Sequence, residues 1–596
     1  MAPLEIGGLA IPWTPTLRPE DTTNMAPYNK QENRTDILPK GWKKSDGKRA
    51  LPCDLVWEQN VEVPLRDGVK IFCDVLRPVT DEKVPAIIAF SPYGKAGHGF
   101  QIYDNCPFRL GIREDATSGL EKFESIDPAE WAPRGYAVVN VDIRGSWESG
   151  GDLYIEATQM GVDAADVIEW IAKRDWCLGT VSMAGNSWLA TTQWIAAIQQ
   201  PPSLKCIAPW EGFTDMYRDV ACRGGIPKED FLGFIFNQTI RGRNRREDVA
   251  KAARDWPLMN AYWQDKVHDA SAIKIPVYAL ASYSSAIHPA GTIRAFNAAG
   301  SKDKWLRVHP TQEWFDLYTK ESTDELQKFF DRYLKNIDNG WEKTPKVRVS
   351  VLTYGDRYAA QPIVNIPFTE YPPQQTVYQK LLLSANKTLV TPATGAITDG
   401  TVSYQADDLR ASPADFVHVF AETTTLLGYS KAKLWVSCNE ADDMDIYLSM
   451  RKQDVNGKLL EHINIPWEAL PEGINTQEDV PNSNTIKHLG MPGVLRASHR
   501  ETDPERSTDI IPFHPHTRED RIPPGTIVPI EIGIWPMGVR FEKGEALVLR
   551  VQGFLDQCVE FPKLINGAPK NRNKGKHIIH ICAKHDSHLI VPTVSV

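Results

Sequence analysis

Short apolar runs that end near glycine or proline alternate with helix-like segments over much of the first half of this 596-residue chain. Two such runs cover residues 84–90 and 136–142, and further strands are expected at 204–209, 275–281 and 305–308. Runs that are apolar on both faces are typical of buried parallel strands. Residues 161–176 place apolar side chains on one helical face. This alternation predicts an open, mostly parallel α/β sheet.

The remaining regions differ in composition and divide the chain. Residues 1–50 are rich in proline and polar side chains, which predicts an extended, loosely held arm. The α/β domain is expected over 51–210 and 273–340, and it starts with a hairpin around Asp67-Gly68. Residues 211–272 interrupt the alternation and are expected to form a helical cap, with the basic run 241–246 on a solvated helix face. From 345 to 596, short strand-like runs between turn residues, beginning at 347–352, predict a β-sandwich or jelly roll.

Charge and hydropathy exclude several classes of protein. The chain has 67 basic and 76 acidic residues, so its net charge of −9 argues against nucleic-acid binding. We find no secretory signal at the N-terminus and no apolar run of about 18 residues that would cross a membrane. The nine cysteines are spread over the chain without paired spacing, as is typical of reduced core residues. A cytoplasmic, soluble protein is therefore expected.

The segment 179–197 has the pattern of a strand, a sharp turn and a helix, with Gly185-Asn186-Ser187-Trp188 at the turn. A glycine two residues before a serine lets the backbone bend tightly and present the hydroxyl above the sheet, as in a nucleophile elbow. The usual second glycine is absent, because Leu189 stands two residues after the serine. The flanking strand and helix nevertheless favour Ser187 as a nucleophile over an ordinary turn serine.

Several motifs together resemble the CocE/NonD family, the cocaine-esterase-like branch of the X-Pro dipeptidyl-peptidase (S15) hydrolases. They are Asp67-Gly-Val-Lys70, Ser91-Pro-Tyr-Gly-Lys95, Trp131-Ala-Pro-Arg-Gly-Tyr136, Asp142-Ile-Arg-Gly145, Gly185-Asn-Ser-Trp188, Phe329-Phe-Asp-Arg-Tyr-Leu-Lys335 and Gly493-Val-Leu-Arg-Ala-Ser-His-Arg500. The resemblance extends from about residue 55 to the C-terminus. It implies an α/β-hydrolase domain with an inserted helical cap, followed by a C-terminal jelly-roll β-sandwich, in agreement with the regions above.

The resemblance also implies site residues, and two of them depart from the family pattern. Tyr93 and the backbone N–H of Trp188 correspond to the donors of the oxyanion hole. The family's acid is an aspartate soon after the next-to-last strand, but residues 281–285 read Ala-Ser-Tyr-Ser-Ser and contain no carboxylate. The family's base is a histidine after the last strand, where this chain has Glu313.

The loops after the last two expected strands of the sheet still contain a histidine and a carboxylate, but each lies in the loop where the family has the other. The loop after 275–281 contains His288, and the loop after 305–308 contains Glu313 with His309 beside it. A serine nucleophile needs a neutral imidazole within reach, and that imidazole needs an orienting partner. We therefore expect Ser187 as nucleophile, His288 as general base and Glu313 as its orienter. His309 is the rival base, and a capping or packing role is the alternative for each histidine.

We expect neither a metal nor a cofactor. A set of histidines and a cysteine near the C-terminus fits a final sandwich strand better than zinc-ligand spacing: His577, His580, Cys582, His585 and His588. The sequence favours a serine hydrolase that cleaves an ester or amide bond of a small, fairly apolar substrate. The alternatives are an acyltransferase or other non-hydrolytic catalyst on the same fold, and a non-catalytic binding protein. No nucleic-acid or membrane partner is expected, and a homo-oligomer is left open.

Overall fold

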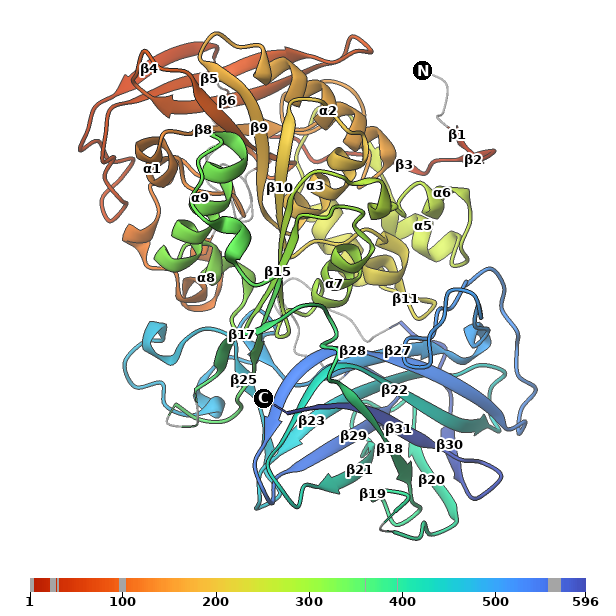
Figure 1. The fold of residues 1–596 in the computed structure, drawn as a ribbon. Coiled ribbons are helices and arrows are strands. Elements are labelled where there is room, and N and C mark those ends of the chain that lie inside the picture. Colours follow the sequence, from red (N-terminus) through yellow and green to blue (C-terminus); the bar gives the residue numbers. More distant parts are fainter. Residues whose placement is uncertain are drawn as a thin grey trace.

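The computed structural model describes residues 5–21, 28, 30, 32–95, 103–357, 359, 361–393, 395–555 and 570–595. Its first part is a sheet with helices, and its second part is rich in strands (Figure 1). The described strands of the first sheet, in spatial order, are β17 (Ile363–Phe368), β16 (Val347–Val351), β15 (Lys304–His309), β14 (Val277–Ser282), β10 (Leu204–Trp210), β9 (Cys177–Asn186), β7 (Val84–Ser91), β8 (Ala137–Asp142), β6 (Lys70–Pro78), β5 (Leu55–Pro64) and β4 (Arg34–Leu38).

The centre of this sheet is parallel, as the apolar runs predict. Strands β8, β7, β9, β10, β14, β15 and β16 pair in parallel along the sheet, so their carboxyl ends meet at one edge. The predicted hairpin around Asp67-Gly68 is confirmed, because β5 and β6 pair antiparallel and Gly68 adopts φ 83° at the turn. The main helices are α1 (Pro128–Trp131), α2 (Thr158–Ala172), α3 (Trp188–Ile198), α7 (Pro289–Ala298), α8 (Glu313–Leu317) and α9 (Lys320–Leu334).

Both faces of the central strands are buried, because alternate residues enter two different cores. Ile88 and Val139 pack in the core that contains α2 and α3. Their chain neighbours Ile87 and Val138 pack in a second core, with Phe329 and other residues of α9. Successive side chains of a strand point to opposite faces, so a strand covered on both sides has apolar residues at most positions.

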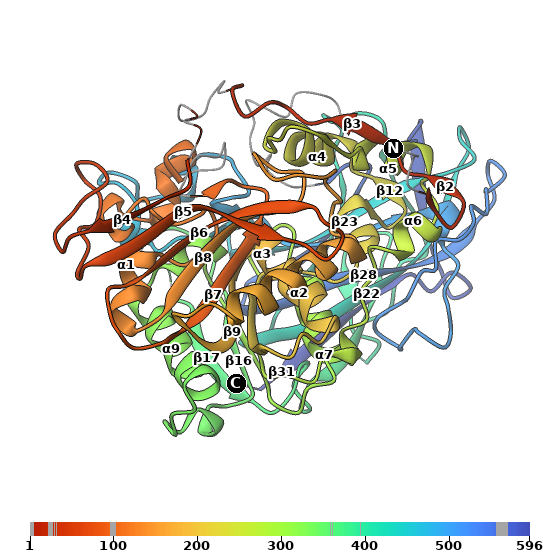
Figure 2. The same cartoon turned by 90° about the horizontal axis from the view of Figure 1, so that it is seen from above.

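The predicted N-terminal arm is held by strand pairing. β4 forms the edge of the first sheet against β5, and β3 (Trp13–Pro15) pairs with β13 (Arg245–Glu247) of the insertion between β10 and β14. Figure 2 shows the N-terminal strands lying along this insertion. Residues 1–4, 22–27, 29 and 31 of the arm lie outside the described residues.

The insertion that was predicted as a helical cap consists of short elements. They are the π-helix η6 (Tyr217–Ala221), β11 (Cys222–Arg223), β12 (Ile226–Pro227), α4 (Glu229–Leu232), the π-helix η7 (Gly233–Gln238), β13, α5 (Val249–Asp255), α6 (Ala261–Gln264) and the 3-10 helix η8 (Ala270–Ala272). The prediction of a solvated helix face for the basic run 241–246 is wrong, because the run enters β13 and Arg246 is buried. Arg243 pairs with Glu148 and Arg245 with Asp152, so acidic partners from a neighbouring loop balance these charges.

The strands of the second part pair antiparallel. They are β18 (Val377–Leu383), β19 (Leu389–Val390), β20 (Gly400–Gln405), β21 (Ala414–Val419), β22 (Thr424–Cys438), β23 (Asp445–Gln453), β24 (Leu459–Leu460), β27 (Met491–Arg496), β28 (Val528–Phe541), β29 (Ala546–Gln552), β30 (Lys576–Ile581) and β31 (His588–Val594). A two-stranded pair, β25 (His462–Ile463) and β26 (Lys487–His488), lies beside them. The histidine-rich segment expected as the final strand is β30, and β31 follows it.

One strand belongs to a different sheet from the one predicted. β16 was expected to open the second domain, but it pairs in parallel with β15, and β17 then pairs antiparallel with β16. The sequence of a single apolar run such as 347–352 does not indicate which sheet the strand belongs to. Within the described ranges, no helix has the length and apolar character needed to cross a membrane.

Candidate active site

Ser187 lies at a strained turn between β9 and α3. Its backbone adopts φ 57° and ψ −116°, a conformation that non-glycine residues rarely adopt. Gly185, at φ 126°, permits the bend, because a Cβ atom there would lie 2.6 Å from the carbonyl oxygen of Glu124. The same carbonyl accepts a hydrogen bond from the N–H of Asn186 at 2.9 Å. The turn therefore has the backbone strain expected of a nucleophile elbow.

Aromatic side chains surround the residues that were expected to form the oxyanion hole. The ring of Tyr93, which follows β7, lies 6.0 Å from the ring of Trp188 and 5.6 Å from that of Phe123. Phe236 of the insertion lies 5.7 Å from Trp188. Tyr93 and Trp188 are both buried, so packed aromatic rings lie on this side of the elbow.

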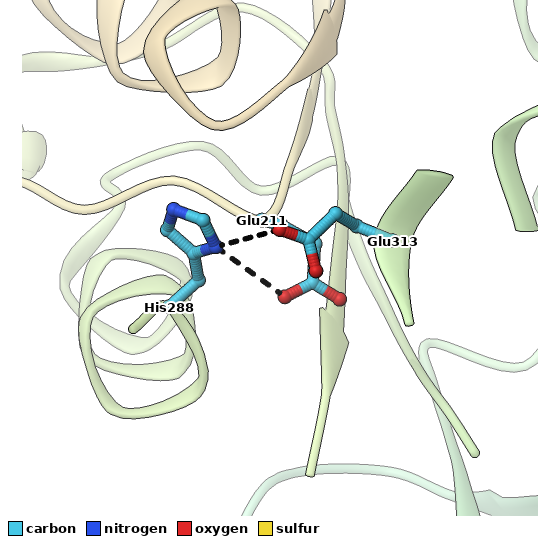
Figure 3. A group of neighbouring side chains, drawn as sticks. All are labelled: Glu211, His288 and Glu313. Atoms are coloured by element: carbon cyan, nitrogen blue, oxygen red, sulfur yellow. Dashed lines mark ion pairs between the residues drawn. The ribbon is translucent and has the colours of Figure 1, made fainter. Parts of the chain in front are cut away.

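His288 and Glu313 come together, as the exchanged-loop hypothesis requires. His288 precedes α7, Glu313 begins α8, and both are buried. The Nδ1 atom of His288 lies 3.4 Å from Oε1 of Glu313 and 3.3 Å from Oγ of Ser285, and its second ring nitrogen points away from the carboxylates (Figure 3). The imidazole stacks on Phe213, with 6.3 Å between the ring centres. This geometry orients the ring and leaves Nε2 for a reacting group.

His309 is the last residue of β15 and is as buried as His288. Its Nε2 atom is 2.9 Å from Oε1 of Glu211, and its Nδ1 atom is 3.2 Å from the hydroxyl of Thr311. Burial lowers the pKa of His309 to about 4, so the imidazole is neutral at physiological pH. Both ring nitrogens of His309 therefore contact protein groups, whereas Nε2 of His288 points away from the carboxylates of Glu211 and Glu313.

The second part of the molecule holds the loop that carries Glu313. The ring nitrogens of His462 lie 2.7 Å from the carbonyl oxygen of Pro310 and 2.8 Å from that of Thr353. The N–H of Gln312 donates to the carbonyl of Asn464 at 2.6 Å. These contacts fix the backbone on the residues directly before Glu313.

Glu211, Glu313 and His288 form one compact group (Figure 3). One nitrogen or oxygen atom from each residue lies within 4.8 Å of the others, a spacing that also suits a divalent cation. In the structure, Oε1 of Glu211 lies at hydrogen-bond distance from His309, and Nδ1 of His288 lies near Ser285 and Glu313. These contacts are those of a hydrogen-bonded group that can transfer protons.

Two family models match the chain. The model of the X-Pro dipeptidyl-peptidase (S15 family) matches residues 67–312, and that of the X-Pro dipeptidyl-peptidase C-terminal non-catalytic domain matches residues 339–590. The crystal structure of a CocE/NonD family hydrolase from Staphylococcus aureus has 31% sequence identity and a TM-score of 0.82, and the match covers 95% of this chain and 97% of that one. The chain belongs to the CocE/NonD family of hydrolases. The family predicted from the sequence motifs is thereby confirmed.

Curated relatives of this CocE/NonD member match it over shorter stretches. Cocaine esterase from a Rhodococcus species is 35% identical over 208 residues, which are 34% of this chain and 33% of the esterase. A putative serine esterase from Mycobacterium tuberculosis is 32% identical over 173 residues, which are 28% of this chain and 26% of that protein. The aligned stretches thus span about a third of these relatives or less.

The sequence analysis missed one member of the candidate site, Glu211. It follows β10 directly, at the carboxyl edge of the sheet where ligands commonly bind in α/β folds. Its position directly after a strand was the only feature of the sequence that could have indicated a role in the site, because the residue belongs to no motif. Its Oε2 atom lies 4.0 Å from Nδ1 of His288. Burial raises the pKa of the Glu211 carboxyl well above its usual range, and the nearby Glu313 and Asp316 raise it further.

Proposed function

We propose that this protein is a serine hydrolase that cleaves an ester or amide bond through an acyl-enzyme on Ser187. The proposal rests on one observation: three residues of the candidate site follow the carboxyl ends of three adjacent strands. The strained Ser187 follows β9, Glu211 follows the next strand β10, and the loop after β14 supplies His288. The backbone N–H of Ser187 donates to the carbonyl of Glu211, whose side chain lies beside His288.

In the proposed reaction, the hydroxyl oxygen of Ser187 attacks the acyl carbon while Nε2 of His288 takes the hydroxyl proton. Glu313 faces Nδ1 and stabilises the imidazolium that forms. The Tyr93 hydroxyl and the Trp188 N–H donate to the developing oxyanion. The imidazolium then gives its proton to the departing alcohol or amine. A water molecule releases the acid from the acyl-enzyme with the same histidine as base.

The aromatic surroundings of the elbow support a small, fairly apolar substrate. The rings of Tyr93, Phe123 and Phe236 gather around or near Trp188, which follows the nucleophile directly. Aromatic side chains provide a large apolar contact area with defined shape. An apolar acyl or alcohol group is therefore the chemistry that we expect here.

For the second part of the chain we propose a jelly-roll arrangement. The antiparallel pairing of its strands and the long central pair β22 and β28 support this. Separation of β19 and β21, the two ends of the strand order, in a crystal structure would contradict it, because the strands would then form one open sheet.

The test of the function is covalent labelling. A fluorophosphonate probe, which reacts with activated serine hydroxyls, is expected to add once to the folded protein. Peptide mapping is expected to locate the adduct on Ser187. A folded protein that does not react, or that carries the adduct on another residue, overturns the proposal; the first of these results would favour a binding protein.

The oxyanion role of Tyr93 makes a separate prediction. Tyr93→Phe removes one hydroxyl donor and keeps the ring that packs on Trp188 and Phe123. We expect kcat to fall about 100- to 1,000-fold, which is the usual effect of losing one oxyanion donor, with little change in KM. Steady-state kinetics on an aryl ester measures this. Phe123→Leu is the matched control, and an unchanged kcat in Tyr93→Phe would remove the tyrosine from the reaction.

A further inference from the structure

We propose that Glu211 is a positioning residue that acts as a neutral hydrogen-bond donor to His309, so that Glu313 alone carries the negative charge beside His288. The inference rests on the proposed function, because it concerns the base of the same reaction. It adds a role for a residue outside the Ser187–His288–Glu313 set, and it gives the buried His309 a role other than that of the base.

Glu211 contacts the nucleophile through its backbone and the two histidines through its side chain. Glu211 adopts φ 66°, in the left-handed region that non-glycine residues rarely occupy. In this conformation its carbonyl accepts the N–H of Ser187 at 3.1 Å, while its carboxyl reaches His309 at 2.9 Å and His288 at 4.0 Å. Strained residues of this kind persist where their surroundings hold them, often at functional sites.

The surroundings of His309 indicate which group carries the proton. Its Nδ1 atom lies 3.6 Å from Asp316 and 3.2 Å from the hydroxyl of Thr311. Asp316 accepts hydrogen bonds from Arg307 and Ser322, which stabilise its ionised form. A carboxylate on this side favours the tautomer with the proton on Nδ1. Nε2 then presents a lone pair to Glu211, and a hydrogen bond at 2.9 Å requires a proton on the carboxyl.

A neutral Glu211 also balances the charge around His288. Glu211 and Glu313 both face Nδ1, and among the described residues none forms a hydrogen bond with Oε2 of Glu211. An ionised carboxylate buried without such partners is costly, so the second negative charge is disfavoured. The titratable and charged groups that act on Glu211 are His288, His309, Glu313, Asp316 and Arg307. Burial and the two nearby acids raise its pKa more than Arg307 lowers it.

A matched pair of glutamine variants tests the proposal in the full chain. Glu211→Gln keeps an N–H donor toward His309, so kcat/KM on an aryl ester is expected to fall far less than in Glu313→Gln. Glu313→Gln replaces the charged orienter and is expected to reduce kcat by about 10⁴-fold. The reverse order, or equal losses in both variants, overturns the proposal and makes Glu211 the charged acid.

Infrared spectroscopy tests the protonation without relying on activity. At pH 7, the wild-type minus Glu211→Gln difference spectrum is expected to contain the C=O band of a protonated carboxylic acid. The corresponding spectrum for Glu313→Gln is expected to contain carboxylate bands instead. A carboxylate signal for Glu211 overturns the proposal even if the Gln variant is poorly active.

His309→Phe provides a third readout. The variant removes the Nε2 lone pair that accepts the proton of the Glu211 carboxyl in the proposed arrangement. The C=O band of the protonated acid is therefore expected to move to higher wavenumber, because the acid has lost its hydrogen-bond acceptor. A band that keeps its position contradicts the inference. Failure of the fluorophosphonate to label the wild type would instead reject the proposed function itself.

Discussion

The Ser187→Ala variant is expected to hydrolyse an aryl ester with a kcat about a million times lower than that of the wild type. Loss of the nucleophile prevents formation of the acyl-enzyme, and oxyanion donors alone provide only a small residual rate. Steady-state turnover measures the loss, and the pre-steady-state burst of alcohol should disappear with it.

A neighbouring serine provides the matched control. Ser182 lies on the same strand, β9, and its buried hydroxyl donates to the carbonyl of Cys206 at 2.8 Å. We expect Ser182→Ala to keep its kcat and to lose about 1 kcal/mol of unfolding free energy. Substantial turnover by Ser187→Ala would mean that another group attacks the substrate.

His288→Ala is expected to cause a loss of similar size, because serine without its base is a poor nucleophile. The double variant Ser187→Ala/His288→Ala should be no slower than either single variant, since the two residues act as one unit. His309→Phe is the control and should retain kcat within about tenfold at its pH optimum. A severe loss in His309→Phe with an active His288→Ala would exchange the roles of the two histidines.

The sequence contained enough information to place the central sheet and the elbow. Mostly apolar runs such as β7 and β8 are buried on both faces, so their pattern predicts a parallel sheet. The sharp turn at Gly185 and Ser187 depends on the local sequence, a glycine two residues before a serine, and can therefore be recognised without the structure. The meeting of His288 with Glu313 could be anticipated because consecutive parallel strands end at the same edge.

Features set by distant contacts could not be predicted in this way. Nothing local to Glu211 indicates that its carboxyl reaches between two histidines, since that depends on the packing of β10 against β14 and on α7. The basic run 241–246 was assigned to a solvated helix because its acidic partners, Glu148 and Asp152, lie about 95 positions away in the chain. Strand β16 was placed in the wrong sheet for the same reason.

The position of β16 and β17 has a practical consequence for recombining relatives of this enzyme. A junction at about residue 340, where helical and strand-rich regions separate in the sequence, would cut two strands away from the sheet that carries the site. It would leave the backbone of β15, the strand leading to Glu313, without its partner β16. Chimaeras should therefore be joined beyond Phe368, so that both edge strands are inherited with the catalytic half.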